Sequence, residues 1–411
     1  MAGYVRRYVD SALDEVFPEL PAVMLTGPRA CGKTTTAARR ARSIVRLDDE
    51  QRAQAFAAAP DALLEAQEPP VLIDEWQEVP SSLAAIKRAI DTGSGGGRFL
   101  ITGSVRARRT ESVWPGTGRV VPFRMHSLAR GEIEGSVTAP GFVERLFGAQ
   151  DLVPSTLTSA PTVVDYVEYA VRGGFPEAID LSERARDSWY PGYVDQLVHR
   201  DVAALADVRS PDRLAALLQA AALSTAGTPQ SKTLTEAAGI DGRTVNTYLD
   251  LLDDLRIIER VPAWSTNRLK RLVRTPKLYV ADTGLATSLL RADRDTILSS
   301  GDLLGRVIDT FVTAQILPLV ALSHPRVDAF HLRDTNGAHE VDLLLEGPGG
   351  AVVGIEIKAA NVVKPQAARH LEWLRESLGG SFTRGIVFHT GDSVYPLGDR
   401  IWAMPIASIW R

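Results

Sequence analysis

One short segment near the N-terminus limits what this chain can fold into and bind. Residues 27–34 fit the pattern G-x-x-x-x-G-K-[ST] without a mismatch. An apolar run precedes the pattern and helix-compatible residues follow it, so the sequence predicts a strand, a phosphate-binding loop and a helix in succession. Glycines let the loop turn its backbone N–H groups inward, where they can cradle a triphosphate. A chance glycine-rich turn is the alternative, and a complete motif in this context argues against it.

The residues of this loop predict a nucleotide and a magnesium ion as its ligands. The ammonium group of Lys33 would reach the β- and γ-phosphates, and the hydroxyl of Thr34 would bind Mg²⁺, because this hard cation prefers oxygen ligands. The residues predicted to contact ATP are consecutive: Gly27, Pro28, Arg29, Ala30, Cys31, Gly32, Lys33, Thr34 and Thr35.

A second signature is the apolar strand predicted at residues 69–73, which is followed by two acids. Asp74 would hold the magnesium ion, and Glu75 would orient or deprotonate the attacking water. An apolar run that ends in acids is weak evidence by itself, because strand ends are polar in many proteins. Its position after a matched phosphate loop makes the interpretation strong.

A further strand is predicted at residues 98–104, and it ends in a small hydroxyl residue, Ser104, that could sense the γ-phosphate. An ordinary strand-end turn is the alternative, since serine is common in turns. The segment behind this strand is rich in arginine, and one of these side chains could stabilise transition-state charge in cis or across a subunit contact. The candidates are Arg106, Arg108, Arg109, Arg119, Arg124 and Arg130.

Composition narrows the class of protein and its partners. A chain of 411 residues suffices for two or three domains, and 45% hydrophobic with 23% charged residues is ordinary globular usage. A formal net charge of −4 argues against attraction of nucleic acid by the whole surface but leaves room for a local basic patch. The single cysteine excludes an intramolecular disulfide. We see no uninterrupted apolar run of export or membrane length, and therefore expect a cytoplasmic protein without a membrane partner.

The middle of the chain predicts a winged-helix module. Residues 234–252 indicate a helix, a tight glycine turn and a second helix, and strands are predicted at 257–261 and 277–280 around a basic segment, 267–274. The functional interpretation sends polar side chains of the second helix into a DNA major groove and the basic segment onto phosphates. A packing module is the alternative, because acids on the second helix would repel a phosphate backbone.

A group of charged residues near the C-terminus forms a second candidate site. A hairpin is predicted around the turn 348–350, and Glu356 and Lys358 share one face of its second strand because alternate strand residues point the same way. Asp342 can join them from the first strand, and Asp309 lies on a preceding predicted helix. Such a set could bind a hard cation, activate water and stabilise a phosphate oxyanion. A salt-bridged hairpin on a solvated sheet edge is the alternative.

Several blocks of the sequence resemble bacterial and archaeal AAA-type ATPases of the signal-transducing P-loop kind that carry a C-terminal domain of unknown function. The resemblance covers nearly the whole chain and is carried by residues 27–35, 73–80, 100–104, 118–119, 173–177, 199–201, 276–286 and the acidic run near Asp342. The charged group near the C-terminus also resembles the core of PD-(D/E)xK nucleases, with Asp342, Glu356 and Lys358 in its motif positions. Where the family often shows a helix glutamate, this chain has Asp309.

The resemblance implies an α/β protein of three domains. A Pro-, Ser- and Gly-containing stretch at about 135–161 marks the first boundary. The domains are then an AAA-like parallel-sheet ATPase domain at 1–155, a helical and winged-helix domain at 156–292, and an α/β restriction-endonuclease-like domain at 293–411.

The combined interpretation is an ATPase that uses ATP and Mg²⁺ and couples its nucleotide state to a C-terminal domain that binds or cuts DNA or RNA. The predicted catalytic residues are Lys33, Glu75, Ser104 and Lys358, and the predicted metal ligands are Thr34, Asp74, Asp342 and Glu356. A function of another class stays open, namely a regulatory ATP switch whose C-terminal domain only binds protein. The sequence leaves the oligomeric state open.

Overall fold

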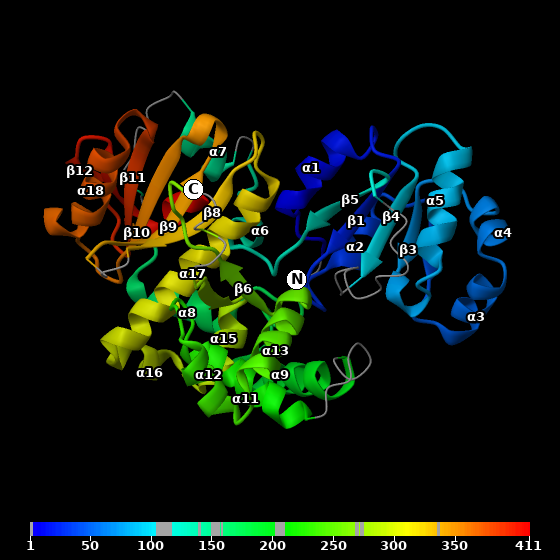
Figure 1. Cartoon of the computed structure of the whole chain (residues 1–411), viewed down its shortest axis with the longest axis horizontal. Coiled ribbons are helices and arrows are strands. Elements are labelled where there is room, and N and C mark those ends of the chain that lie inside the picture. The colour runs from blue at the N-terminus through cyan, green and yellow to red at the C-terminus, as the bar shows by residue number, and fades with distance from the viewer. Residues whose placement is uncertain are drawn as a thin grey trace. The chain divides into compact units, whose positions relative to one another are not determined.

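The computed structural model of the chain describes residues 3–103, 117–138, 141–148, 157, 159–201, 210–267, 271, 275–334 and 338–411. These residues form two structural units, whose helices and strands are drawn in Figure 1. Each unit has its own hydrophobic core. The N-terminal unit comprises Ala2–Leu128 with Asp254–Arg256, and the C-terminal unit comprises Ala129–Asp253 with Ile257–Arg411. The predicted boundaries at residues 155 and 292 stay predictions.

A five-stranded sheet forms the centre of the N-terminal unit. Its strands are β1 (Ala22–Thr26), β2 (Ser43–Arg46), β3 (Val71–Asp74), β4 (Phe99–Gly103) and β5 (Val120–Arg124). They lie in the order β2-β3-β4-β1-β5, and all neighbours are parallel. The prediction of a parallel α/β sheet is confirmed, as are the three strands predicted before the loop, at residues 69–73 and at residues 98–104. Strand β5 was not predicted from the sequence.

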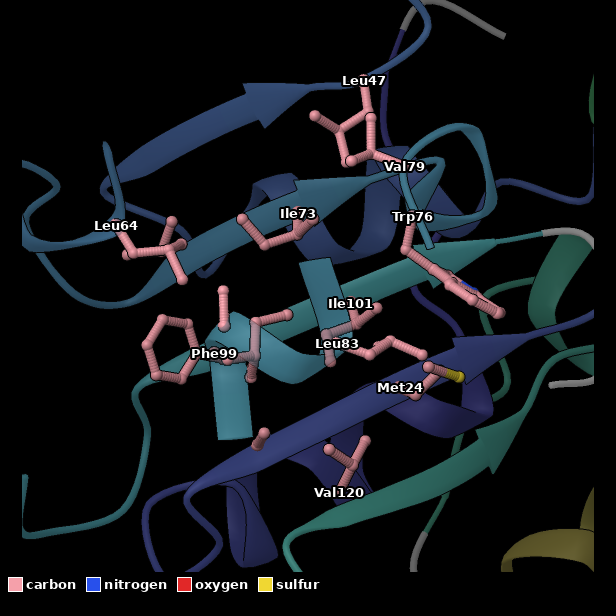
Figure 2. Packing of buried hydrophobic residues seen from close by; sticks show 14 of the residues in the cluster. Met24, Leu47, Leu64, Ile73, Trp76, Val79, Leu83, Phe99, Ile101 and Val120 are labelled. Atoms are coloured by element: carbon pink, nitrogen blue, oxygen red, sulfur yellow. The ribbon is translucent and has the colours of Figure 1, made fainter. Parts of the chain in front are cut away.

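Helices on the faces of this sheet explain why its central strands are apolar throughout. The connecting elements are α1 (Tyr8–Val16), α2 (Lys33–Ala38), α3 (Glu50–Ala58), α4 (Pro60–Glu65), the short 3₁₀ turn η1 (Trp76–Glu78) and α5 (Ser82–Thr92). Strands β1, β3 and β4 are buried along their whole length, as expected for strands covered on both faces. Figure 2 shows the core between these layers, which includes Met24, Ile73, Trp76, Phe99 and Ile101. The core holds the carboxyl ends of these strands, where the predicted nucleotide residues lie.

The first half of the C-terminal unit is mainly helical. Its elements are α6 (Arg130–Ile133), α7 (Phe142–Phe147), α8 (Val163–Arg172), α9 (Glu183–Gln196), the π-helical turn η3 (Leu197–Asp201), α11 (Pro211–Leu223), α12 (Ser231–Ala238), α13 (Gly242–Asp254), α15 (Thr283–Leu290) and α16 (Arg294–Ser299). Asp282 caps α15 by accepting the N–H of Leu285 at 3.0 Å, and it also accepts the N–H of Gly174 at 2.8 Å. A Cβ on Gly173 would lie 2.2 Å from the Tyr190 hydroxyl, so the lack of a side chain at Gly173 lets Tyr190 pack closely against it.

Two strands in this half of the unit connect it to the sheet of the second half. Strands β6 (Ile258–Val261) and β7 (Lys277–Val280) pair antiparallel after the α12–turn–α13 segment, in the order predicted from the sequence. Beyond β6, the N–H of Trp264 donates to the carbonyl of His331 at 2.6 Å, and the N–H of His331 donates to the carbonyl of Pro262 at 2.9 Å. The β6–β7 pair is thereby joined to the sheet that follows.

A six-stranded mixed sheet forms the second half of the C-terminal unit. Its strands are β8 (Asp328–Arg333), β9 (Glu340–Glu346), β10 (Val352–Ile357), β11 (Phe382–His389), β12 (Tyr395–Gly398) and β13 (Ile401–Pro405). They lie in the order β12-β13-β11-β10-β9-β8. Short 3₁₀ turns occur at η4 (Pro348–Gly350), η5 (Pro365–Ala368), η6 (Gly379–Ser381) and η7 (Ile406–Ile409), and helix α18 (Arg369–Leu378) packs on β10 and β11. The predicted hairpin is confirmed, because β9 and β10 pair antiparallel across η4.

The longest helix, α17 (Gly301–Leu322), contacts β8 and β10. The sequence analysis expected no apolar segment of membrane length, but α17 is long and apolar enough to cross a membrane by length and composition alone. Most of its apolar window, 61%, is buried inside the C-terminal unit, and it carries the buried acid Asp309. In this structure α17 is a core helix of the unit.

Candidate functional site

The backbone of the predicted phosphate loop is bent sharply between β1 and α2. Ala30 and Gly32 have φ angles of 60° and 96°, in the left-handed region that favours glycine. At Gly27, a Cβ would lie 2.5 Å from the carbonyl oxygen of Met125, which leaves no room for a side chain. The two glycines of the motif are therefore required for different reasons: one for its φ angle and one for close packing.

The side chain of Lys33 lies within the curve of this loop. It is buried, and its Nζ donates to the carbonyl oxygens of Gly27 at 3.1 Å and Pro28 at 2.8 Å. Cys31 is also buried, and its carbonyl accepts a hydrogen bond from Arg7 at 2.7 Å. The ammonium group is thus already at the loop that would hold phosphate.

The two predicted magnesium ligands of the N-terminal unit lie side by side. The hydroxyl of Thr34 donates to Oδ1 of the buried Asp74 at 2.8 Å, and the hydroxyl of Thr102 donates to the same oxygen. A hydroxyl and a carboxylate at this separation suit the oxygen-rich coordination of Mg²⁺. The sequence analysis missed Thr102, although a polar residue within the apolar run of β4 was an available signal.

Glu75, the predicted activator of water, directly follows β3 and has a φ angle of 53°. One of its carboxylate oxygens, Oε2, accepts a hydrogen bond from the side-chain amide of Gln77, a residue that the sequence analysis also missed. The end of β4 is close to the same turn: a Cβ on Gly103 would lie 2.5 Å from Nε1 of Trp76. The Glu75 carboxylate is therefore held by a neighbour and not left to move freely.

Some predicted residues beside this site lie outside the described part of the chain, namely Ser104, Arg106, Arg108 and Arg109. Among the described arginines, Arg119 pairs with Asp91, and Arg130 pairs with Glu134 at 2.8 Å. The prediction of an arginine that stabilises transition-state charge stays a prediction.

The charged group near the C-terminus is brought together by neighbouring strands. In the β9–β10 hairpin Ile355 lies opposite Leu343, and Glu356 and Asp342 are the next residues along the two strands. Nζ of Lys358 lies 2.6 Å from Oε2 of Glu356 and 3.9 Å from Oδ2 of Asp342. The three residues predicted to share this site therefore do so.

A fourth residue at this site, Lys277, was not predicted. It begins β7 and is buried, and its Nζ lies 2.7 Å from Oδ2 of Asp309 and 3.4 Å from Oδ1 of Asp342. The hydroxyl of Tyr279 donates to Oδ1 of Asp309 at 3.1 Å. We call Lys277, Asp309, Asp342, Glu356 and Lys358 the C-terminal cluster. The only sequence signal for Lys277 was its position directly before the apolar strand residues 278–280.

Burial controls the protonation of this cluster. It raises the pKa of Glu356 to about 8, with the charge of Asp342 acting in the same direction. Burial also raises the pKa of Asp309 to about 6, against the attraction of Lys277. For Lys277, burial alone would lower the pKa, but the charges of Asp309, Tyr279 and Asp342 hold it well above its usual value. Lys277 is therefore a charged ammonium group throughout the neutral range.

The contacts of the C-terminal cluster do not fit a divalent metal site. Asp342 gives one oxygen to Lys277, and the other accepts the N–H of Ile357 at 2.9 Å. Oε2 of Glu356 is taken by Lys358. Within the part of the chain that the structure describes, no group of three or more His, Cys, Asp or Glu side chains is arranged to hold a metal ion. The metal role predicted for Asp342 and Glu356 stays a prediction.

The predicted winged-helix module has acids and bases that neutralise each other. Arg260 on β6 lies 2.7 Å from Asp250 and 3.0 Å from Asp253 of α13, so two of the acids expected to repel DNA are paired. Most of the basic segment lies outside the described residues, but Arg271 is described, and it donates to Glu346 at 2.6 Å. This arginine is not available to a phosphate in the structure, and the module's role in DNA binding stays a prediction.

Comparison with known proteins divides the chain into three matched segments. Residues 19–134 match an AAA domain, residues 163–296 match a domain of unknown function (DUF8612), and residues 304–409 match another domain of unknown function (DUF4143). Uncharacterized proteins of Mycobacterium bovis (strain AF2122/97) and Mycobacterium tuberculosis (strain H37Rv) are each 27% identical over 416 residues, which cover 98% of this chain and 84% of each relative. The expected AAA domain with a C-terminal domain of unknown function is confirmed, and the middle segment matches a second domain of unknown function.

Proposed function

We propose that this chain, whose residues 19–134 match an AAA domain, binds and hydrolyses Mg²⁺-ATP. The observation that carries the proposal is the hydrogen bond between Thr34 and Asp74, which come from separate motifs and meet beside the buried Lys33. If the loop were only a glycine-rich surface turn, nothing would require a buried ammonium group and a buried carboxylate at this spacing. Nucleotide hydrolysis needs both.

Each residue then has a distinct task. Lys33 would exchange its loop carbonyls for the β- and γ-phosphates, and backbone N–H groups of residues 29–35 would surround the phosphates. Thr34 and Asp74 would hold the magnesium ion, which would supply positive charge against the phosphate oxygens. Glu75 orients or deprotonates the attacking water after Gln77 releases or redirects its carboxylate.

Glu75→Gln should separate binding from hydrolysis. The substitution keeps the size of the side chain and leaves Lys33, Thr34 and Asp74 in place, so ATP should still bind. Loss of the carboxylate should lower kcat by about 10²–10⁴-fold, the usual contribution of a general base. Steady-state release of phosphate, measured beside equilibrium binding of ATP, tests this.

Glu78→Gln is the matched control, because Glu78 is an exposed glutamate of the same 3₁₀ turn. This variant should keep the turnover of the parent protein. Equal turnover in the Glu75 and Glu78 variants would remove Glu75 from the mechanism.

We further propose that the nucleotide state is coupled to a C-terminal domain that binds or cuts DNA or RNA. The support is the arrangement of Asp342, Glu356 and Lys358 on adjacent strands, which is the arrangement expected of a nuclease-like core. Lys358 is the accessible base of the cluster, with 39% of its side chain exposed, and can contact a phosphate oxygen. Since the carboxylates do not fit a metal ion as they stand, we assign no cleavage step to them.

Lys358→Ala should weaken binding of DNA or RNA, because it removes the exposed ammonium group of the cluster. Labelled single- and double-stranded DNA and RNA would be titrated with the full chain, with and without ATP and Mg²⁺, and cleavage and ATP turnover would be measured in the same samples. Lys364→Ala, an exposed lysine outside the cluster, is the control. If both variants bind as the parent does, or if no nucleic acid binds in any nucleotide state, the cluster has no role in nucleic-acid recognition.

A second candidate is a regulatory ATP switch whose C-terminal domain only binds protein. The contacts of Lys277 favour it, because they occupy the acids that a nuclease would use for metal. Stimulation of ATP turnover by DNA or RNA would favour the nucleic-acid function, and its absence would favour the switch.

A further inference from the structure

Lys277 has a complete set of partners inside the C-terminal cluster. An ammonium group has three N–H donors and no acceptor. Nζ of Lys277 has three oxygen acceptors: Oδ2 of Asp309 at 2.7 Å, and both Oδ1 and the backbone carbonyl of Asp342 at 3.4 Å. Its side chain is only 3% exposed. Because Lys277 is held on β7, its side chain contacts the acids from the protein interior and not from the solvent side.

The acids around Lys277 have few free oxygens for another cation. Asp309 gives Oδ2 to Lys277, and its Oδ1 accepts from Tyr279 at 3.1 Å and from Thr313 at 3.3 Å. Asp342 divides its two oxygens between Lys277 and the N–H of Ile357. A divalent ion needs several such oxygens at once, and these are already bound to donors.

One buried oxygen of the cluster is without a partner. Oε1 of Glu356 makes no hydrogen bond among the described residues, and the residue is 2% exposed. Its other oxygen, Oε2, accepts from Lys358 at 2.6 Å. A buried carboxyl oxygen with nothing bound to it marks a position where a cation or proton can be accommodated.

The charged groups of the cluster show what would change if Lys277 were absent. Two ammonium groups, of Lys277 and Lys358, face the three carboxyl groups of Asp309, Asp342 and Glu356. Without Lys277, Oδ1 of Asp342 would lose its donor, and together with the unpartnered Oε1 of Glu356 it would be free to bind a divalent cation.

We propose that Lys277 is the built-in cation of the C-terminal cluster, and that its ammonium group excludes Mg²⁺ and Mn²⁺ from Asp342 and Glu356. The cluster is closed to divalent ions while Nζ lies between Asp309 and Asp342, and it becomes a metal site when that ammonium group is removed. Lys277 thus determines which cation the cluster holds. This inference concerns the C-terminal unit alone and is independent of ATP hydrolysis.

Binding of Mn²⁺ to the full-length chain tests the proposal. All proteins would carry Lys33→Ala and Asp74→Ala, so that the predicted magnesium ligands near the loop contribute little, and no nucleotide would be added. On this background we compare the parent, alone and with Glu356→Gln, with Lys277→Met and with Lys277→Met/Asp309→Asn. The last of these is also made with Glu356→Gln. The double substitution removes both members of the buried pair, so it keeps a folded test protein if the single one unfolds. Lys232→Met, an exposed lysine of α12, controls for the change in net charge.

Mn²⁺ binding is measured by electron paramagnetic resonance and by calorimetry, with circular dichroism as the check on folding. We expect no Mn²⁺ bound by the cluster of the parent or of the Lys232 variant. The Lys277→Met/Asp309→Asn protein should gain about one ion per chain, and Glu356→Gln should abolish that gain. Mn²⁺ binding by the parent that Glu356→Gln removes would overturn the proposal, because Lys277 would then not exclude the metal. A folded double variant that binds no Mn²⁺ would overturn it as well.

Discussion

Replacement of Lys33 by alanine should abolish tight binding of Mg²⁺-ATP. The ammonium group is the only side-chain cation that the motif places against the β- and γ-phosphates, and each hydrogen bond to a charged group contributes about 1.5–3 kcal/mol. Loss of both phosphate contacts should weaken ATP binding about 100-fold or more. Calorimetric titration with ATP in the presence of Mg²⁺ measures the dissociation constant directly.

Lys87→Ala provides the comparison for this experiment. Lys87 lies on α5 of the same unit and pairs with Asp91 at the surface, 2.7 Å away. The Lys87→Ala protein should bind ATP as the parent does, because it undergoes the same change in net charge as Lys33→Ala, but away from the loop. Parent-like affinity in the Lys33 variant would contradict the ATPase assignment itself.

The second large effect is expected for the stability of the C-terminal unit. Lys277→Met should lower its free energy of unfolding by about 3–5 kcal/mol, because the substitution leaves Asp309 as a buried charge without its partner. Combining it with Asp309→Asn should restore most of that loss, since the two charges are then absent together. Urea denaturation, followed by a probe within the C-terminal unit, gives the three unfolding free energies.

An exposed ion pair shows how much of this effect is due to burial. Lys232 and Glu236 lie 3.8 Å apart on α12 with most of each side chain exposed, so Lys232→Met should change the unfolding free energy by less than about 1 kcal/mol. If Lys277→Met were no more destabilising than this, the Lys277–Asp309 pair would not hold the cluster together.

The sequence predicted which residues meet at the ends of β1 and β3, because the motifs that carry them are contiguous and each is tied to one strand end. Residues 27–35 and the acids after β3 are fixed by short local patterns, and the parallel sheet brings Thr34 and Asp74 together. Strand β5 was missed because its burial is irregular and Pro122 interrupts it. Thr102 and Gln77 were missed because their roles depend on contacts across the strand ends, which no motif describes.

The C-terminal cluster was predicted only in part, for a reason of chain topology. Asp342 and Glu356 lie on the two strands of one hairpin and Lys358 directly follows the second, and the turn and alternation of this hairpin are visible in the sequence. Lys277 reaches them from 32 residues before Asp309 and 65 residues before Asp342. Sequence pattern alone gives no reason to bring a strand of the middle region to that hairpin, so the cation at the centre of the cluster was missed.

The junction between β6–β7 and the six-stranded sheet decides how this protein can be divided for experiments. Lys277 supplies the counter-charge for Asp309, Arg271 supplies it for Glu346, and Trp264 bonds to His331. A fragment that begins at residue 293 would keep the acids and discard both bases, and would expose the edge that Trp264 covers. A C-terminal fragment that keeps these contacts therefore has to begin before Trp264, and the matched segment 304–409 lacks all three of these residues.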